Sequence, residues 1–212
     1  MSEITHHIPE PMLAAYAAGT LPPVFETVVA THVSMCATCR AGMQAHEMAG
    51  GAVLEEGGAV DLSDALKADV LALLDGPAPE DRPAPKRKGI YPGPVMAALK
   101  NREPRWKSLG MGVRQSILMD GPDGSLRLLY IPPGRAVPDH GHNGIEMTLV
   151  LQGSFSDETG AFGVGDLEVA DEELDHTPVA GEGLPCICLA ATDAPLRFHS
   201  VLPRLLQPLF RI

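Results

Sequence analysis

The chain of 212 residues carries 27 acidic and 16 basic side chains, which gives a formal net charge of -11 at pH 7. This balance argues against direct binding of nucleic acid, and it fits either a basic protein partner or plain solubility. No secretory signal pattern and no apolar segment of membrane-spanning length is present, so we expect a cytoplasmic protein without membrane contact. The four cysteines form a Cys-x-x-Cys and a Cys-x-Cys group, which indicates metal or redox chemistry in a reducing compartment.

Charge and proline content divide the chain into three parts. Residues 1–76 hold ten acidic and two basic side chains, and residues 109–212 hold fourteen and six. Between them, residues 77–108 hold three acidic and eight basic side chains, and residues 77–94 contain six prolines. We therefore predict an N-terminal domain at 1–76, a proline-rich basic linker at 77–94 and a second domain at 95–212.

The first domain carries helical signals throughout. Prolines at the first turn predict one helix at 12–18 and a second that opens at Pro23, and the run 36–48 is helical as well. The sequence leaves open whether the second and third helices are continuous. A last helix follows the Gly57-Gly58 pair. Its row of leucine and valine side chains belongs either to the core or to a surface that a partner covers.

The candidate site of this domain is the stretch His32-x-x-x-Cys36-x-x-Cys39. On one continuous helix its three side chains would share a face, at positions i, i+4 and i+7. Two thiolates and one imidazole suit a tetrahedral structural zinc ion, with His6 or His7 as the fourth ligand. The alternatives are a pair of small buried cysteines beside a surface histidine, or a redox pair.

The first domain also looks poor in core residues. It has only two aromatic side chains, and a domain of this size buries roughly 60% of its chain surface on folding. A structural zinc ion contributes ~10 to 16 kcal/mol at neutral pH. We therefore expect the ion to decide whether the first three helices fold together.

The second domain changes to short β-type runs that are separated by turn residues. This pattern predicts an all-β barrel or sandwich, so the expected fold is a small all-α domain followed by an all-β domain. The predicted strands cover residues 113–119, 126–131, 145–152, 167–170, 186–191 and 196–201.

Four residues of the second domain form a second candidate metal site. His140 and His142 lie two apart on an extended segment and therefore face the same side. Glu146 reaches the same point from the following strand, and His176 arrives later with acidic neighbours of its own. Three imidazoles and one carboxylate suit zinc, manganese, iron or nickel, and the alternative is a set of separate surface side chains.

Cys186 and Cys188 also lie two apart on one predicted strand, and we expect them to face the barrel interior. A disulfide between them would be strained, because extended neighbours two apart lie near the upper limit of Cα separation for a bridge. We interpret them as small buried apolar residues. The alternative is a site of oxidation that senses a signal.

The segment from Gly134 to Gly153, with His140, His142 and Glu146 at fixed spacing, resembles the first motif of the cupin family at every position. The second cupin motif is only partly present: its first glycine and its ligand histidine stand in place, but its proline, second glycine and asparagine do not. The resemblance implies that the second domain is a cupin, a jelly-roll barrel.

A His and Cys-x-x-Cys helical domain followed by a single cupin resembles the ChrR group of zinc-binding anti-sigma factors, over nearly the whole chain. The resemblance implies an N-terminal Zn²⁺ on His7, His32, Cys36 and Cys39, with His6 as the alternative to His7. It also implies that the helical domain binds and inhibits a group IV (extracytoplasmic-function) sigma factor, and that the cupin serves the response to singlet oxygen and related oxidants. A second zinc ion would be held by His140, His142, Glu146 and His176.

Two rival functions stay open at this point. A metal-dependent cupin enzyme, such as a dioxygenase, would use the same three histidines and glutamate. A metal sensor would need exchangeable sites, which the thiolate set disfavours. The N-terminal zinc domain favours a regulator that is not an enzyme, because an enzyme has no evident use for it.

Overall fold

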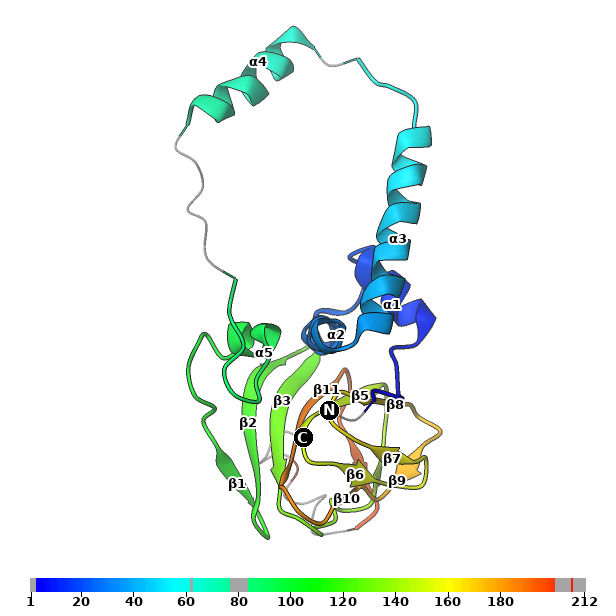
Figure 1. The fold of residues 1–212 in the computed structure, drawn as a ribbon, viewed down its shortest axis with the longest axis vertical. Coiled ribbons are helices and arrows are strands. Elements are labelled where there is room, and N and C mark those ends of the chain that lie inside the picture. The colour runs from blue at the N-terminus through cyan, green and yellow to red at the C-terminus, as the bar shows by residue number, and fades with distance from the viewer. Residues whose placement is uncertain (1–2, 62, 77–83, 201–206, 208–212) are drawn as a thin grey trace.

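A computed structural model describes residues 3–61, 63–76, 84–200 and 207 of the chain (Figure 1). The helices precede the barrel strands in the chain, and the last of them leads directly into the first strand. They are α1 (Glu10–Ala17), α2 (Pro23–Met35), α3 (Ala37–Glu56), α4 (Asp64–Ala72) with the short 3-10 turn η1 (Leu73–Asp75), and α5 (Gly93–Ala98). No helix in these ranges is long and apolar enough to cross a membrane.

The helical run through the Cys-x-x-Cys motif is broken at Cys36. This residue is extended, with φ -104° and ψ 115°, so α2 ends at Met35 and α3 begins at Ala37. Its Sγ accepts a hydrogen bond from the backbone N–H of Cys39 at 3.5 Å and thereby caps α3. Of the two possibilities that the sequence leaves open, the structure has the break, and His32 and Cys39 belong to different helices that meet at a corner.

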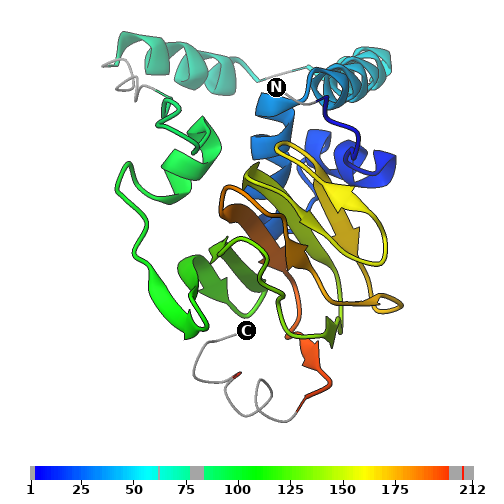
Figure 2. The same cartoon turned by 60° about the horizontal axis from the view of Figure 1, so that its bottom comes forward.

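The third helix is longer than the sequence indicates. We expected it to end near Met48, but α3 passes through Gly50 and Gly51 and ends at Glu56. Ser63 then caps α4, since its Oγ accepts a hydrogen bond from the backbone N–H of Leu66 at 3.2 Å. Every described residue from 47 to 76 is exposed. Figures 1 and 2 both show α4 apart from the barrel.

The rest of the chain folds as the predicted all-β barrel. A six-stranded antiparallel sheet has the order β1-β2-β3-β11-β5-β8, and two three-stranded sheets, β10-β6-β7 and β12-β4-β9, complete it. The strands are β1 (Lys107–Gly110), β2 (Val113–Gly121), β3 (Gly124–Ile131), β4 (His140–Gly141), β5 (Glu146–Gln152), β6 (Phe155–Ser156), β7 (Ala161–Phe162), β8 (Leu167–Ala170), β9 (Asp175–His176), β10 (Val179–Ala180), β11 (Cys186–Thr192) and β12 (Arg197–Phe198).

Five of the six predicted strands are present as β2, β3, β5, β8 and β11, whereas β1 and the two-residue strands other than β12 were not predicted. Of the predicted strand 196–201, only Arg197–Phe198 is a strand, and residue 201 lies outside the described residues. The two-residue strands are too short for an alternating pattern to be recognised in the sequence. They matter because β4 and β9 carry candidate metal ligands.

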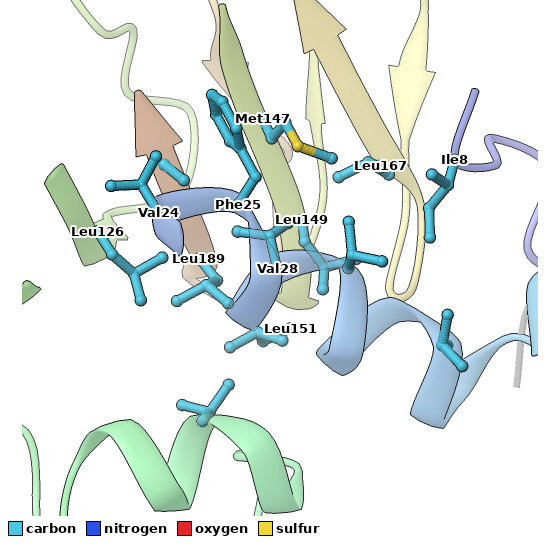
Figure 3. Close-up of a cluster of buried hydrophobic side chains, with 14 of the residues drawn as sticks. Ile8, Val24, Phe25, Val28, Leu126, Met147, Leu149, Leu151, Leu167 and Leu189 are labelled. Carbon is cyan, nitrogen blue, oxygen red and sulfur yellow. The ribbon is translucent and has the colours of Figure 1, made fainter. Parts of the chain in front are cut away.

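The outer face of the six-stranded sheet is covered by α2, which also contacts α5 (Figure 3). Phe25 and Val28 of α2 lie in one continuous core with Leu149 of β5 and Leu189 of β11. The sequence indicated a helical domain with a poor core of its own, whereas in the structure the core of the first three helices continues into the barrel. The second helix buries its apolar surface on the barrel, at roughly 1.5 to 3 kcal/mol for each large side chain, and α1 and α3 pack on each other and on α2.

Truncation of this shared core should destabilise helices and barrel together. Phe25 is 1% exposed, and we expect Phe25→Ala to cost about 3 to 5 kcal/mol. Denaturant unfolding followed both by helical circular dichroism and by the fluorescence of Trp106 should give coincident transitions that shift together. Val53→Ala, at a position that is 71% exposed, serves as the control and should stay within about 0.5 kcal/mol. Two separate transitions would contradict the shared core.

Candidate metal centres

Four side chains converge where α2 and α3 meet. They are His7, His32, Cys36 and Cys39, and one ligand atom from each lies within 4.8 Å of the others. His32 Nε2 lies 3.3 Å from Cys39 Sγ, and His7 Nδ1 lies 3.4 Å from Cys36 Sγ and 3.7 Å from Cys39 Sγ. The break at Cys36 makes this convergence possible, because it brings the start of α3 back toward the end of α2.

The two candidate histidines before α1 point in different directions. His7 faces the cysteines, whereas the ring of His6 packs on Phe162 with centroids 4.4 Å apart. His6 Nδ1 also lies 3.5 Å from Asp166 Oδ1. The geometry therefore brings His7, and not His6, into the N-terminal group.

The protonation of the N-terminal group suits metal binding. Burial, together with the neighbouring His7, lowers the pKa of His32 to about 4, so its imidazole is neutral at physiological pH. A neutral imidazole is the form that binds a metal ion. Burial raises the pKa of the Cys39 thiol, so a bound cation would be needed to hold it as a thiolate. Two sulfurs and two imidazole nitrogens are a donor set typical of tetrahedral structural sites.

The second group lies inside the barrel. His140 of β4 and His176 of β9 are direct partners across the strand pair, and their Nε2 atoms are 3.2 Å apart. His142 Nε2 lies 3.3 Å from His176 Nε2, and Glu146 Oε2 lies 3.5 Å from His142 Nδ1. All four side chains are buried. The structure thus brings together the four residues that the sequence predicts, and they are not separate surface side chains.

Two carboxylates that the sequence did not single out orient His176. Its Nδ1 lies 2.7 Å from Asp157 Oδ2 and 3.4 Å from Glu168 Oε1, which leaves Nε2 to face the other histidines. Burial alone would lower the pKa of His176, but the hydrogen bonds to Glu168 and Asp157 raise it to about 9. Burial raises the pKa of Glu168 to about 7. The partners of His176 Nδ1 thus come from elsewhere in the chain, whereas its acidic sequence neighbour Asp175 pairs with Arg197 and His199.

A cavity of about 350 Å³ opens beside the barrel group. Leu129, Val137 and Phe198 contribute apolar walls, and Cys188 also lines it. Cys186 and Cys188 do face the interior, and a hydrogen bond from Cys186 and burial hold the pKa of the Cys188 thiol well above its usual value. A protonated, buried thiol is a poor nucleophile, which favours the interpretation of this pair as small core residues.

The two histidines before α1 offer a direct test of the N-terminal group. His7→Ala should remove the ion bound there, whereas His6→Ala should leave it in place, because only His7 faces the thiols. Metal content of the purified chain and the thiolate-to-cobalt absorption of a Co²⁺-loaded sample would measure this. The reverse outcome, with the ion lost only in His6→Ala, would contradict the geometry.

Comparison with known proteins places the whole chain in one family. The family model of the ChrR cupin-like domain matches residues 95–194. The anti-sigma-E factor ChrR of Cereibacter sphaeroides is 55% identical over 213 residues, which cover 99% of both chains. The crystal structure of Rhodobacter sphaeroides SigE in complex with the anti-sigma ChrR matches with 51% identity and a TM-score of 0.78, over 90% of this chain and 100% of the matched one. The chain belongs to the ChrR family of anti-sigma factors.

Proposed function

We propose that this protein binds and inhibits a group IV (extracytoplasmic-function) sigma factor, and that its barrel controls release in response to singlet oxygen or related oxidants. The observation that carries the proposal is an apolar, acidic surface on α3, α4 and η1 that no other described element covers. The similarity to ChrR, whose relative was crystallised with SigE, supports the identity of the partner. As a regulator of this kind, the chain acts by binding and not by catalysis.

The composition of the surface fits such a partner. Residues 47–76 contain seven acidic side chains and one basic side chain, which suits a sigma factor that is basic where it meets promoter DNA. Its apolar members are too many for a surface that faces only water. They are Met48, Val53, Leu54, Val60, Leu66, Val70, Leu71, Leu73 and Leu74.

We further propose that the N-terminal group holds a structural Zn²⁺ on His7, His32, Cys36 and Cys39. Such an ion would tie the segment before α1 to the corner between α2 and α3, and so fix the direction in which α3 leaves the barrel. Two sulfur and two nitrogen donors support zinc. The two cysteines, bound as thiolates, would contribute the negative charge that the ion requires.

For the barrel we propose a second divalent ion, zinc in preference to manganese, iron or nickel, on His140, His142, Glu146 and His176. Three nitrogen donors and one carboxylate suit any of these metals. The ion would supply a positive charge next to Asp157 and Glu168, whose carboxylates hold His176 in place. The chain itself contributes four buried ligand side chains and the two carboxylates that orient His176.

The domain division at 1–76, 77–94 and 95–212 and a cytoplasmic location complete the proposal. The barrel family match at 95–194 supports the third part, and residues 77–83 of the linker lie outside the described residues. A cytoplasmic location follows from the proposed partner, which acts on RNA polymerase. A direct contact with DNA is not needed for this function.

A second candidate function is metal-dependent catalysis in the barrel, and the cavity beside His140 and His176 favours it. Cupin enzymes need an open metal position next to a substrate pocket. Oxygen consumption by the iron-loaded full chain, with candidate substrates, tests it. Turnover that is lost in His140→Ala would support the enzyme, and its absence while sigma binding persists would leave the regulator.

The exposed leucines of η1, directly after α4, should carry much of the sigma binding. Leu73 and Leu74 are each 78% exposed, and replacing both by aspartate should weaken the complex by about tenfold or more. Leu184 on the barrel is 67% exposed, so Leu184→Asp is a matched control that should bind normally. Isothermal titration calorimetry with a group IV sigma factor measures the difference. Equal affinity for both variants would place the binding surface elsewhere.

The N-terminal ion should be required for this capture. Cys36→Ala removes one thiolate and the cap of α3, and we expect loss of the complex together with loss of one metal ion. Co-purification with the sigma factor, with metal content measured on the complex, is the test. A metal-free variant that still inhibits transcription by the sigma-bound polymerase would overturn the structural role of the ion.

A further inference from the structure

A buried carboxylate of the barrel holds the segment that carries His7. Asp166 Oδ1 accepts hydrogen bonds from the backbone N–H groups of Thr5 at 2.7 Å and His6 at 2.9 Å. Its Oδ2 accepts one from the N–H of Gly163 at 2.8 Å, which fixes the carboxylate to the barrel. The side chain is 7% exposed, so these bonds are shielded from water.

Three further contacts seat the same segment on the barrel. The backbone N–H of Leu167 donates to the carbonyl of His6 at 3.3 Å, and the His6 ring packs on Phe162. Gly165 has a φ of +96°, and a Cβ there would lie 2.5 Å from Ile4 Cδ1. Only glycine allows this backbone and this close approach. Residues 4–6 are therefore held by the barrel on both sides of the chain.

His7 follows this segment directly and reaches the N-terminal group from it. No helix or strand includes residues 3–9, so the chain before α1 has no regular structure of its own to place His7. His7 is also the one exposed member of its group, whereas the other three are buried on α2, at the corner and on α3. The barrel thus supports the chain before His7, and Ile8, which is buried in the core that includes α2, supports it on the other side.

The same stretch of chain reaches the barrel group. Glu168, two residues after Asp166, directs its carboxylate to His176 Nδ1 at 3.4 Å. Asp166 and Leu167 bind the N-terminal segment, and Glu168 binds a member of the barrel group. Residues 166–168, at the start of β8 and just before it, therefore connect the segment next to His7 with one member of the barrel group.

We propose that Asp166 is a positioning residue for His7, and that through residues 166–168 the affinity of the N-terminal group for its ion depends on the barrel group. The inference rests on the ligand sets of the proposed function. It identifies the physical route by which a change in the barrel reaches the helices. Loss of a barrel ligand loosens His176, and the loosened start of β8 releases the segment before His7.

The first test compares aspartates at the two ends of β8 in the full chain. Asp166→Ala should weaken Co²⁺ binding, read from the thiolate-to-cobalt absorption against a competing chelator, by about 10- to 100-fold. The Asp171 carboxylate is exposed and accepts a hydrogen bond from the N–H of Glu173 in its own turn, so Asp171→Ala should leave the affinity unchanged. Asp166→Asn keeps the shape and one acceptor oxygen, so it should fold and show a smaller loss. Equal Co²⁺ affinity in the wild type and both Asp166 variants overturns the proposal.

The second test is a double-mutant cycle with the same absorption, which reports only the thiolate site. His140→Ala should weaken N-terminal Co²⁺ binding by about fivefold or more in the wild-type background. In the Asp166→Ala background it should have no further effect, since the route is already cut. Additive losses, or no effect of His140→Ala, overturn the connection. A wild-type chain without any thiolate absorption would instead refute the proposed N-terminal ligand set.

Discussion

The packing of α2 on the outer face of the six-stranded sheet is the constraint on which the rest of the molecule depends. The helix lies between the sheet and α5, and its apolar side is fully buried there. This packing fixes the corner at Cys36, and the corner in turn brings two helices and the N-terminal segment to one point. A small helical body that is poor in core residues can therefore hold a defined shape.

This arrangement also separates two kinds of apolar surface. The part of the helical region that touches the barrel is buried, whereas every described residue in 47–76 is exposed. Regulation of a partner requires both properties at once, a rigid base and an exposed binding surface. The metal-capable corner lies at the boundary between the part of the helices that packs on the barrel and the exposed binding surface.

Local patterns predicted most of the elements, the barrel group and three members of the N-terminal group, and they left the fourth open between His6 and His7. Proline positions marked the starts of α1 and α2, alternating apolar residues marked the long strands, and the histidine spacings identified the barrel group. The break at Cys36 was not predictable, because helical periodicity runs through it and the break depends on tertiary contacts. Asp157, Asp166 and Glu168 were missed for a related reason: a carboxylate that accepts hydrogen bonds from distant backbone or imidazole groups has no spacing signature in the sequence.

The length of α3 has a mechanical consequence. Its 20 residues span about 30 Å at 1.5 Å per residue, and one end is anchored at the metal-capable corner while the other is free of the barrel. A tilt of about 10° at the anchored end would sweep the far end through about 5 Å, as follows from that length. A small distortion of the corner is thereby magnified, as by a lever arm, into a displacement large enough to break side-chain contacts at the tip.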